Sequence, residues 1–192
     1  IHIVVRMKTF SEYTDSKKRT VRESTASQYT LFPKDKGELE YMIEEEIKKQ
    51  GNNADLNHIE VSRITDFSDL FYCSMFNGDI SEWDVSNVTN MSNMFCGAGA
   101  FHSDLSGWDV SNVTNMSFMF SWSKFNGDVS YWDVRNVNDM SYMFSRCPFN
   151  GRLKIWNVKN VTNMQNMFEF NTEFNQDISK WNVSNVKNMS FM

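Results

Sequence analysis

Few side chains in this sequence have the types and spacing that catalysis requires. No histidine is paired with a cysteine or serine in a recognisable catalytic arrangement, and there is neither a phosphate-binding loop nor a cluster of metal-ligand residues. We therefore predict a protein that is not an enzyme and that needs no cofactor. The histidines are His2, His58 and His102.

The three cysteines, Cys73, Cys96 and Cys147, are an odd number and do not have the spacing of metal ligands. A disulfide framework would need an even and dense set of cysteines. We therefore expect free, partly buried thiols.

Two sets of recurring polar residues match the patterns of calcium binding and of N-glycosylation. Aspartates that recur at Asp79, Asp104, Asp128 and Asp177 would suit calcium, but Arg152 takes that place in one copy and no dense oxygen cage is visible, so no metal is predicted. Several asparagines begin N-glycosylation sequons. Because repetition alone generates these tripeptides, we interpret them as structural. They are Asn87, Asn90, Asn112, Asn115, Asn160, Asn182 and Asn188.

A repeat of 24 or 25 residues positions most of these groups. Six copies run from about residue 55 to the end, and the first is looser, with Ile59 in the place of a tryptophan. A period of this length is typical of stacked repeat architectures. It also separates Cys73 and Cys96 by about one repeat, so adjacent repeats could bring them close. The tryptophans of the other five copies are Trp83, Trp108, Trp132, Trp156 and Trp181.

Each copy joins two periodicities. Trp83 and Val85 alternate with polar residues, which is typical of a short strand with one buried face. Val88, Met91 and Met94 then follow helical spacing, which favours a short helix or 3₁₀ turn. The sequence therefore predicts an α/β solenoid of right-handed, leucine-rich-repeat-like coils whose short strands form a parallel sheet.

The recurring residues favour structural roles. Trp, Val, Met and Phe positions most simply form stacked ladders in the core. One column of Asn and Asp is predicted to bond the backbone at the turn between strand and helix; it comprises Asp66, Asn90, Asn115, Asp139, Asn163 and Asn188. A second column is predicted to form a hydrogen-bonded ladder between coils, with Asn87, Asn112, Asn136, Asn160 and Asn185.

Two regions precede the repeats. Residues 1–32 are polar and lack a regular period, so we expect a flexible arm. Residues 33–51 are predicted to form an amphipathic helix, with Asp35 and Glu38 at capping-box spacing. This helix and its lead-in, residues 33–54, are expected to cover the apolar end of the first coil. The six copies occupy residues 55–192, and the last is incomplete.

Charge and hydropathy exclude some partners. The net charge of −5 argues against nucleic acid as the main partner. The longest aliphatic run, Ile3 to Val5, is too short to span a membrane or to form the core of a signal peptide.

The segment from Trp83 to Phe95, preceded by the phrase Phe-Asn-Gly-Asp-Ile-Ser from Phe76, resembles the repeat of the BspA-like leucine-rich-repeat surface proteins, the DUF285 group. The resemblance covers about residues 55–192. It implies a leucine-rich-repeat-like fold used for adhesion and protein binding at a cell surface or outside the cell, and such repeats also occur in phage and mobile-element genomes. No signal peptide or anchor is visible in the chain, which leaves a cytoplasmic or virion-associated location open.

Two surfaces are candidates for contact with a partner. In a leucine-rich-repeat-like coil, the outward strand residues line a concave face, and here an aromatic and a basic residue are expected to meet in the middle coils. That face comprises Glu82, Asp84, Tyr131, Asp133, Arg135, Ile155, Asn157, Lys159 and Lys180. The second candidate is an aromatic patch on the helical side, formed by Phe118, Trp122 and Tyr142, which could equally be local packing.

These observations lead to two hypotheses for the function. The first is a non-enzymatic module that binds a protein or a cell-surface ligand through its repeat-built face. The second is a structural component of a larger particle, which self-associates through the C-terminal end of the stack, at Phe191 and Met192.

Overall fold

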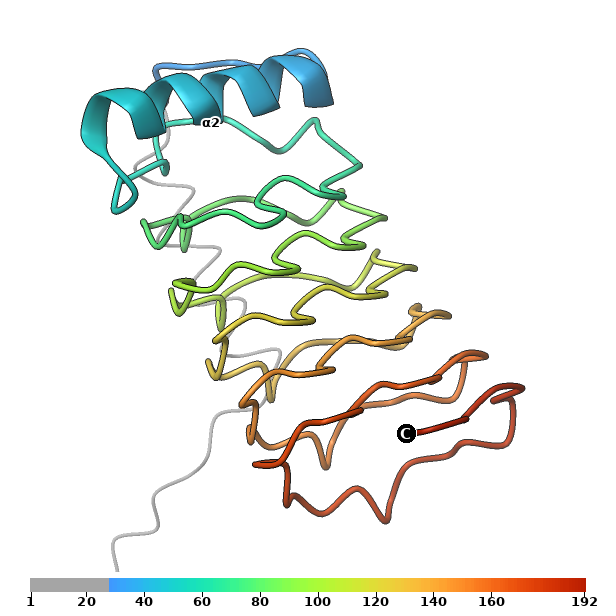
Figure 1. Ribbon diagram of the computed structural model, residues 1–192. Coiled ribbons are helices and arrows are strands. Elements are labelled where there is room, and N and C mark those ends of the chain that lie inside the picture. Colours follow the sequence, from blue (N-terminus) through green and yellow to red (C-terminus); the bar gives the residue numbers. More distant parts are fainter. Residues whose placement is uncertain (1–27) are drawn as a thin grey trace, which may run out of the picture.

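The computed structural model describes residues 28–192, which form a stack of coils with about one repeat in each coil (Figure 1). Helix α2, Lys36–Gln50, lies at one end of the stack and is the one helix of the described residues. Residues 1–27 of the predicted arm, with His2, lie outside the described residues. The division into an arm, a cap and a repeat region stays a prediction.

The predicted α/β solenoid of leucine-rich-repeat-like coils is wrong, because the repeats of residues 55–192 contain neither strands nor helices. The segment expected to be a strand lies between two turns: the Trp83 N–H donates to the Ile80 carbonyl, and the Val88 N–H donates to the Val85 carbonyl. Parallel contacts between coils are isolated bridges, which do not extend into a sheet. They link Asp66, Asn90, Asn115, Asp139, Asn163 and Asn188 in order.

Side-chain acceptors explain why no strand forms. The Oδ1 atoms of Asp79, Asp84 and Asn90 accept hydrogen bonds from the backbone N–H two residues later, at 2.9, 3.1 and 3.1 Å. Such bonds use N–H groups that a strand ladder would need, and they favour turns. The turn role predicted for the column that contains Asn90 is therefore confirmed, and it recurs at two further places in the coil.

The segment expected to be helical is also a series of turns. The N–H of Met94 donates to the carbonyl of Met91 in the same coil, whereas the N–H of Asn93 donates to the carbonyl of Ser117 in the next coil. Alternate N–H groups are thus shared between the coil itself and its neighbour. Because half of these donors point along the stack, an α-helical i→i−4 pattern cannot form.

Two ladders of side-chain hydrogen bonds join the coils. The second asparagine column is confirmed as a ladder, because each of its amides donates to a backbone carbonyl of the preceding coil at 2.7–2.8 Å. Each repeat tryptophan also donates from Nε1 to a carbonyl of the preceding coil, at 2.9–3.1 Å. All five of these indoles are buried, so the bonds satisfy both the N–H and the carbonyl away from water.

The core is one continuous cluster in which phenylalanine rings form two adjacent columns. Within a coil, the rings of Phe120 and Phe125 stack at 4.0 Å, and Phe120 stacks on Phe144 of the next coil at 5.7 Å. Equivalent pairs recur from Phe71 to Phe174. The predicted Trp, Val, Met and Phe ladders are therefore confirmed as core.

Helix α2 covers the first coil. Asp35 is its N-cap and accepts a hydrogen bond from the Glu38 N–H at 2.9 Å, as the capping spacing predicts. Leu39 and Ile43 are buried against the core of the first coils. The helix ends at Gln50 and is capped by Gly51, whose φ of 83° suits glycine.

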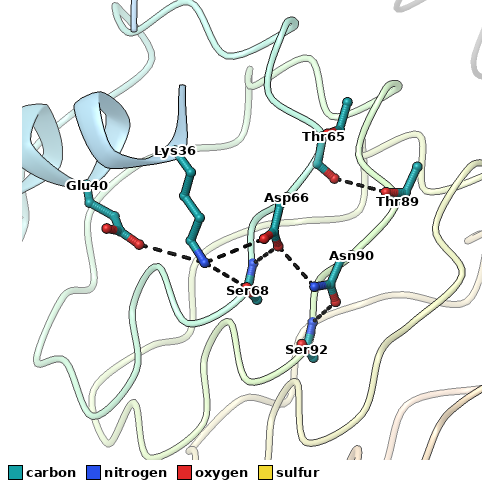
Figure 2. A network of polar contacts seen from close by, with 8 residues as sticks. All are labelled: Lys36, Glu40, Thr65, Asp66, Ser68, Thr89, Asn90 and Ser92. Carbon is teal, nitrogen blue, oxygen red and sulfur yellow. Dashed lines mark hydrogen bonds and ion pairs between the residues drawn. The ribbon is translucent and has the colours of Figure 1, made fainter. Parts of the chain in front are cut away.

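A polar network fixes the start of α2 to the stack (Figure 2). The Lys36 ammonium donates to Ser68 Oγ at 2.7 Å and lies 3.8 Å from carboxylate oxygens of both Asp66 and Glu40. Asp66 also accepts from the Asn90 amide at 3.0 Å. Burial alone would raise the pKa of Asp66, but hydrogen bonds from Ser68 and the charge of Lys36 outweigh it and hold the pKa below its usual value. Lys36 of α2 thus contacts Asp66, the first residue of the column that continues with Asn90.

Candidate functional site

The predicted concave face lacks the strands that would make it concave, because the described residues contain no strand there. Its residues nevertheless lie at the surface, and Tyr131 and Ile155 are 46% and 66% exposed. Asp133 is the half-buried exception. A binding role for this set stays a prediction.

Charged residues in the middle and at the acidic end of this face already interact within the chain. The Arg135 guanidinium makes two contacts with the Asp133 carboxylate, at 2.9 Å from Nε and 2.8 Å from an η nitrogen. At the acidic end, partial burial and the nearby carboxylates of Glu60, Asp84 and Glu82 raise the pKa of Tyr29. The Arg135 charge of this face is therefore already paired within the chain.

The turn segment that replaces the predicted helix has two columns of residues with left-handed backbone conformation. Their φ values lie between 52° and 71°, and most of these residues are not glycine. Bulky side chains rarely adopt this conformation. The first column holds Asp69, Asn93, Phe118, Tyr142, Asn166 and Phe191, and the second holds Cys73, Gly97, Trp122, Arg146 and Phe170.

The predicted aromatic patch lies on these two columns. The rings of Phe118 and Tyr142 stack at 4.3 Å across adjacent coils, and both residues are half-buried. Trp122 lies four residues after Phe118 and is 62% exposed. The structure thus brings Phe118 and Tyr142 together as expected and places Trp122 in the neighbouring column.

That neighbouring column holds a stacked cation, which the sequence analysis missed. The guanidinium of Arg146 lies 4.4 Å from the ring centroid of Trp122 and 4.1 Å from that of Phe170. These three residues, from three successive coils, are named here the Arg146 column. The signal was present in the sequence, since one repeat length separates each residue of this column from the next.

The Arg146 column is exposed but ordered by its neighbours. Trp122 and Phe170 are 62% and 63% exposed. The Trp122 N–H donates to the Ser145 carbonyl at 2.9 Å, and the Arg146 N–H donates to the Glu169 carbonyl at 2.8 Å. Backbone bonds on Trp122 and Arg146, and a cation between two rings, thus organise an exposed cluster of aromatic and charged groups.

The two described histidines contact other residues of the chain, and a polar pocket lies between adjacent coils. The His58 ring lies 3.6 Å from the Glu46 carboxylate of α2, and the His102 ring lies beside the Asn77 amide. An open pocket of about 350 Å³ is lined by polar residues of adjacent coils, among them Asp79 and Asp104. No group of three or more metal-ligand side chains occurs within residues 28–192.

The three cysteines are free thiols in different surroundings. Cys73 is exposed, and its N–H donates to the Cys96 carbonyl at 2.7 Å, so adjacent coils do bring these residues close. Cys147 is buried and its thiol donates to the Phe125 carbonyl at 3.1 Å. Burial raises the pKa of the Cys147 thiol to about 11, although hydrogen bonds oppose this shift.

Comparison with known proteins places these features in a family. The profile described as "Mycoplasma protein of unknown function, DUF285" matches residues 38–148 and 121–192. The chain belongs to the DUF285 family. No curated protein and no solved structure matches it. The family description gives no activity, so function rests on the chain's own geometry.

Within residues 28–192, no helix has the length and apolar character that crossing a bilayer requires.

Proposed function

We propose that this DUF285 chain is a non-enzymatic protein-binding module, and that the Arg146 column is its main contact site. The observation that supports this is the exposed Trp122–Arg146–Phe170 stack, because tryptophan and arginine are enriched among the residues that dominate interface energies. The likeness to BspA-like surface proteins favours the same class of function, adhesion through protein contacts.

The arrangement meets two physical requirements of a contact site. Two aromatic residues that are each more than 60% exposed give apolar area to bury on association. The stack also holds these side chains in place before a partner arrives, which lowers the entropy lost on binding. The predicted face around Tyr131 offers exposed apolar area too, but its arginine is already paired with Asp133.

The test is selection of random peptides displayed on phage against the whole chain. Peptides that bind the wild type should lose most of their binding to Trp122→Ala and to Phe170→Ala. Tyr41→Ala, at a 64% exposed aromatic residue on α2, is the matched control and should bind normally. If Tyr131→Ala and Ile155→Ala abolish binding instead, the predicted face is the contact site and the Arg146 column is not.

A structural role is the second candidate. Phe191 is 78% exposed and Met189 is 40% exposed in the last described coil, which favours self-association there. Light scattering across a range of concentrations tests it: an oligomer that dissociates when Phe191 and Met192 are replaced by charged residues would support assembly. A mass that stays monomeric at all concentrations would exclude it.

A further inference from the structure

We propose that the Arg146 column selects a carboxylate-bearing, Asp- or Glu-containing segment of a partner protein. This inference rests on the proposed function and adds the chemistry of the partner. It starts from the geometry of the guanidinium. Rings from the two neighbouring coils cover its faces at 4.4 and 4.1 Å, so its N–H edge is the part left to make hydrogen bonds.

Arg146 has no acidic partner among the described residues. Among residues 28–192, no carboxylate oxygen lies within ion-pair distance of Arg146, even though the Glu169 backbone carbonyl accepts its N–H. Arg135 gives the contrast, because Asp133 occupies its fork with two contacts. Within residues 28–192, Arg135 is thus paired with an acid, whereas Arg146 is held in place by two rings without an ion-pair partner.

A guanidinium that is held in place before binding loses less entropy when it pairs with an anion. A free surface arginine loses side-chain entropy when it pairs, so exposed ion pairs contribute little. Arg146 has already lost much of that freedom in its stack. The exposed rings of Trp122 and Phe170 flank the cation, and a partner that covers them would exclude water from the ion pair and strengthen it.

The shape of the guanidinium favours a carboxylate as its partner. A guanidinium fork matches the two oxygens of a carboxylate. Phosphate groups on proteins are usually recognised by clusters of arginines, whereas the Arg146 column offers one guanidinium. A carboxylate next to apolar residues, which would cover the rings, fits both parts of the column.

Peptide selection followed by binding measurements tests this directly. Peptides selected against the whole chain should be enriched in Asp or Glu beside apolar residues. A selected peptide, labelled for fluorescence anisotropy, should bind Arg146→Ala at least roughly tenfold more weakly than the wild type, because a charge-assisted hydrogen bond is lost. Arg146→Lys should also bind weakly, since an ammonium cannot provide the fork. Arg135→Ala is the matched control and should bind as the wild type does.

Changes in the peptide provide the second arm. Replacing its Asp or Glu with Asn or Gln should weaken binding as much as Arg146→Ala does, and the two changes together should add little. Replacing the same acid with phosphoserine should not improve binding; a large improvement would overturn the carboxylate assignment. Thermal unfolding of each variant separates lost binding from lost folding.

The outcomes distinguish the inference from the function on which it rests. If no peptide depends on Trp122 and Phe170, the proposed function fails. If peptides depend on both rings but carry no acid, or bind Arg146→Ala as tightly as wild type, the contact site stands and the carboxylate inference is wrong.

Discussion

Replacing Gly127 with alanine should destabilise the protein. The usual reason for glycine in an Asn-Gly pair, a turn with positive φ, does not apply here. Gly127 does not have positive φ, so alanine is conformationally allowed there. The obstacle is space: a Cβ on Gly127 would lie 2.8 Å from ring carbons of Phe125. That ring is fully buried and stacks at 4.0 Å on Phe120, so it has little room to shift.

The size of the effect follows from two terms. Overpacking of a buried site costs about 1–3 kcal/mol. Alanine in place of glycine also restricts the unfolded chain, which stabilises the fold by about 0.4–1 kcal/mol. Gly99 is the matched control, because its Cβ would meet nothing closer than 4.0 Å, and Gly99→Ala should show only the second term. The two variants should therefore differ by about 1–3 kcal/mol.

Thermal unfolding followed by tryptophan fluorescence measures this difference. For a chain of this size, about 2–4 °C corresponds to 1 kcal/mol, so Gly127→Ala should melt roughly 2–12 °C below Gly99→Ala. Gly78→Ala should be at least as damaging, because its Cβ would also meet the Ala54 carbonyl. If Gly127→Ala and Gly99→Ala melt together, the phenylalanine columns are not packed as described and the steric argument is refuted.

Three further predictions concern the ladders, the buried thiol and the cap. Trp132→Phe removes the indole bond to the Leu105 carbonyl, which keeps its bond from the Trp108 N–H, so urea unfolding should show a loss of about 0.5–1.5 kcal/mol from the hydrogen bond. The stability of the wild type should fall relative to Cys147→Ser as pH rises from about 9 to about 11, because the thiol ionises in the unfolded chain but stays protonated in the folded one; parallel pH profiles of the two proteins would contradict this. Lys36→Met should lower stability by about 1 kcal/mol, and Asp66→Asn should cost less in the Lys36→Met background than in the wild type, as a double-mutant cycle by urea unfolding would show.

The sequence predicted the period, the core and both asparagine columns because these follow directly from residue identity at a fixed spacing. It also predicted the cap at Asp35, where local spacing alone determines the bond. The secondary structure was wrong for a physical reason. Trp83 and Val85 are buried and do alternate with exposed residues, but Asp79 and Asp84 take the backbone donors that a strand would use.

The helical spacing was misleading in the same way. Met91 and Met94 face the core because successive turns bring them there, while the N–H of Asn93 is used by the next coil. Hydrophobic periodicity indicates which side chains are buried, but it does not indicate which carbonyl accepts the hydrogen bond from each backbone N–H. Arg146 was not predicted, because the column alternates an aromatic ring, a cation and an aromatic ring and so does not repeat one type of side chain.

The central claim is that a partner contacts the Arg146 column and leaves the ladders intact, and the indole N–H signals in an NMR titration test it most directly. The chain has six tryptophans; five donate within the stack, and Trp122 is the exposed sixth. Adding a selected acidic peptide should shift the Trp122 indole signal and leave the other five in place. Shifts confined to the five ladder indoles, or no shift at Trp122 under saturating peptide, would contradict the account.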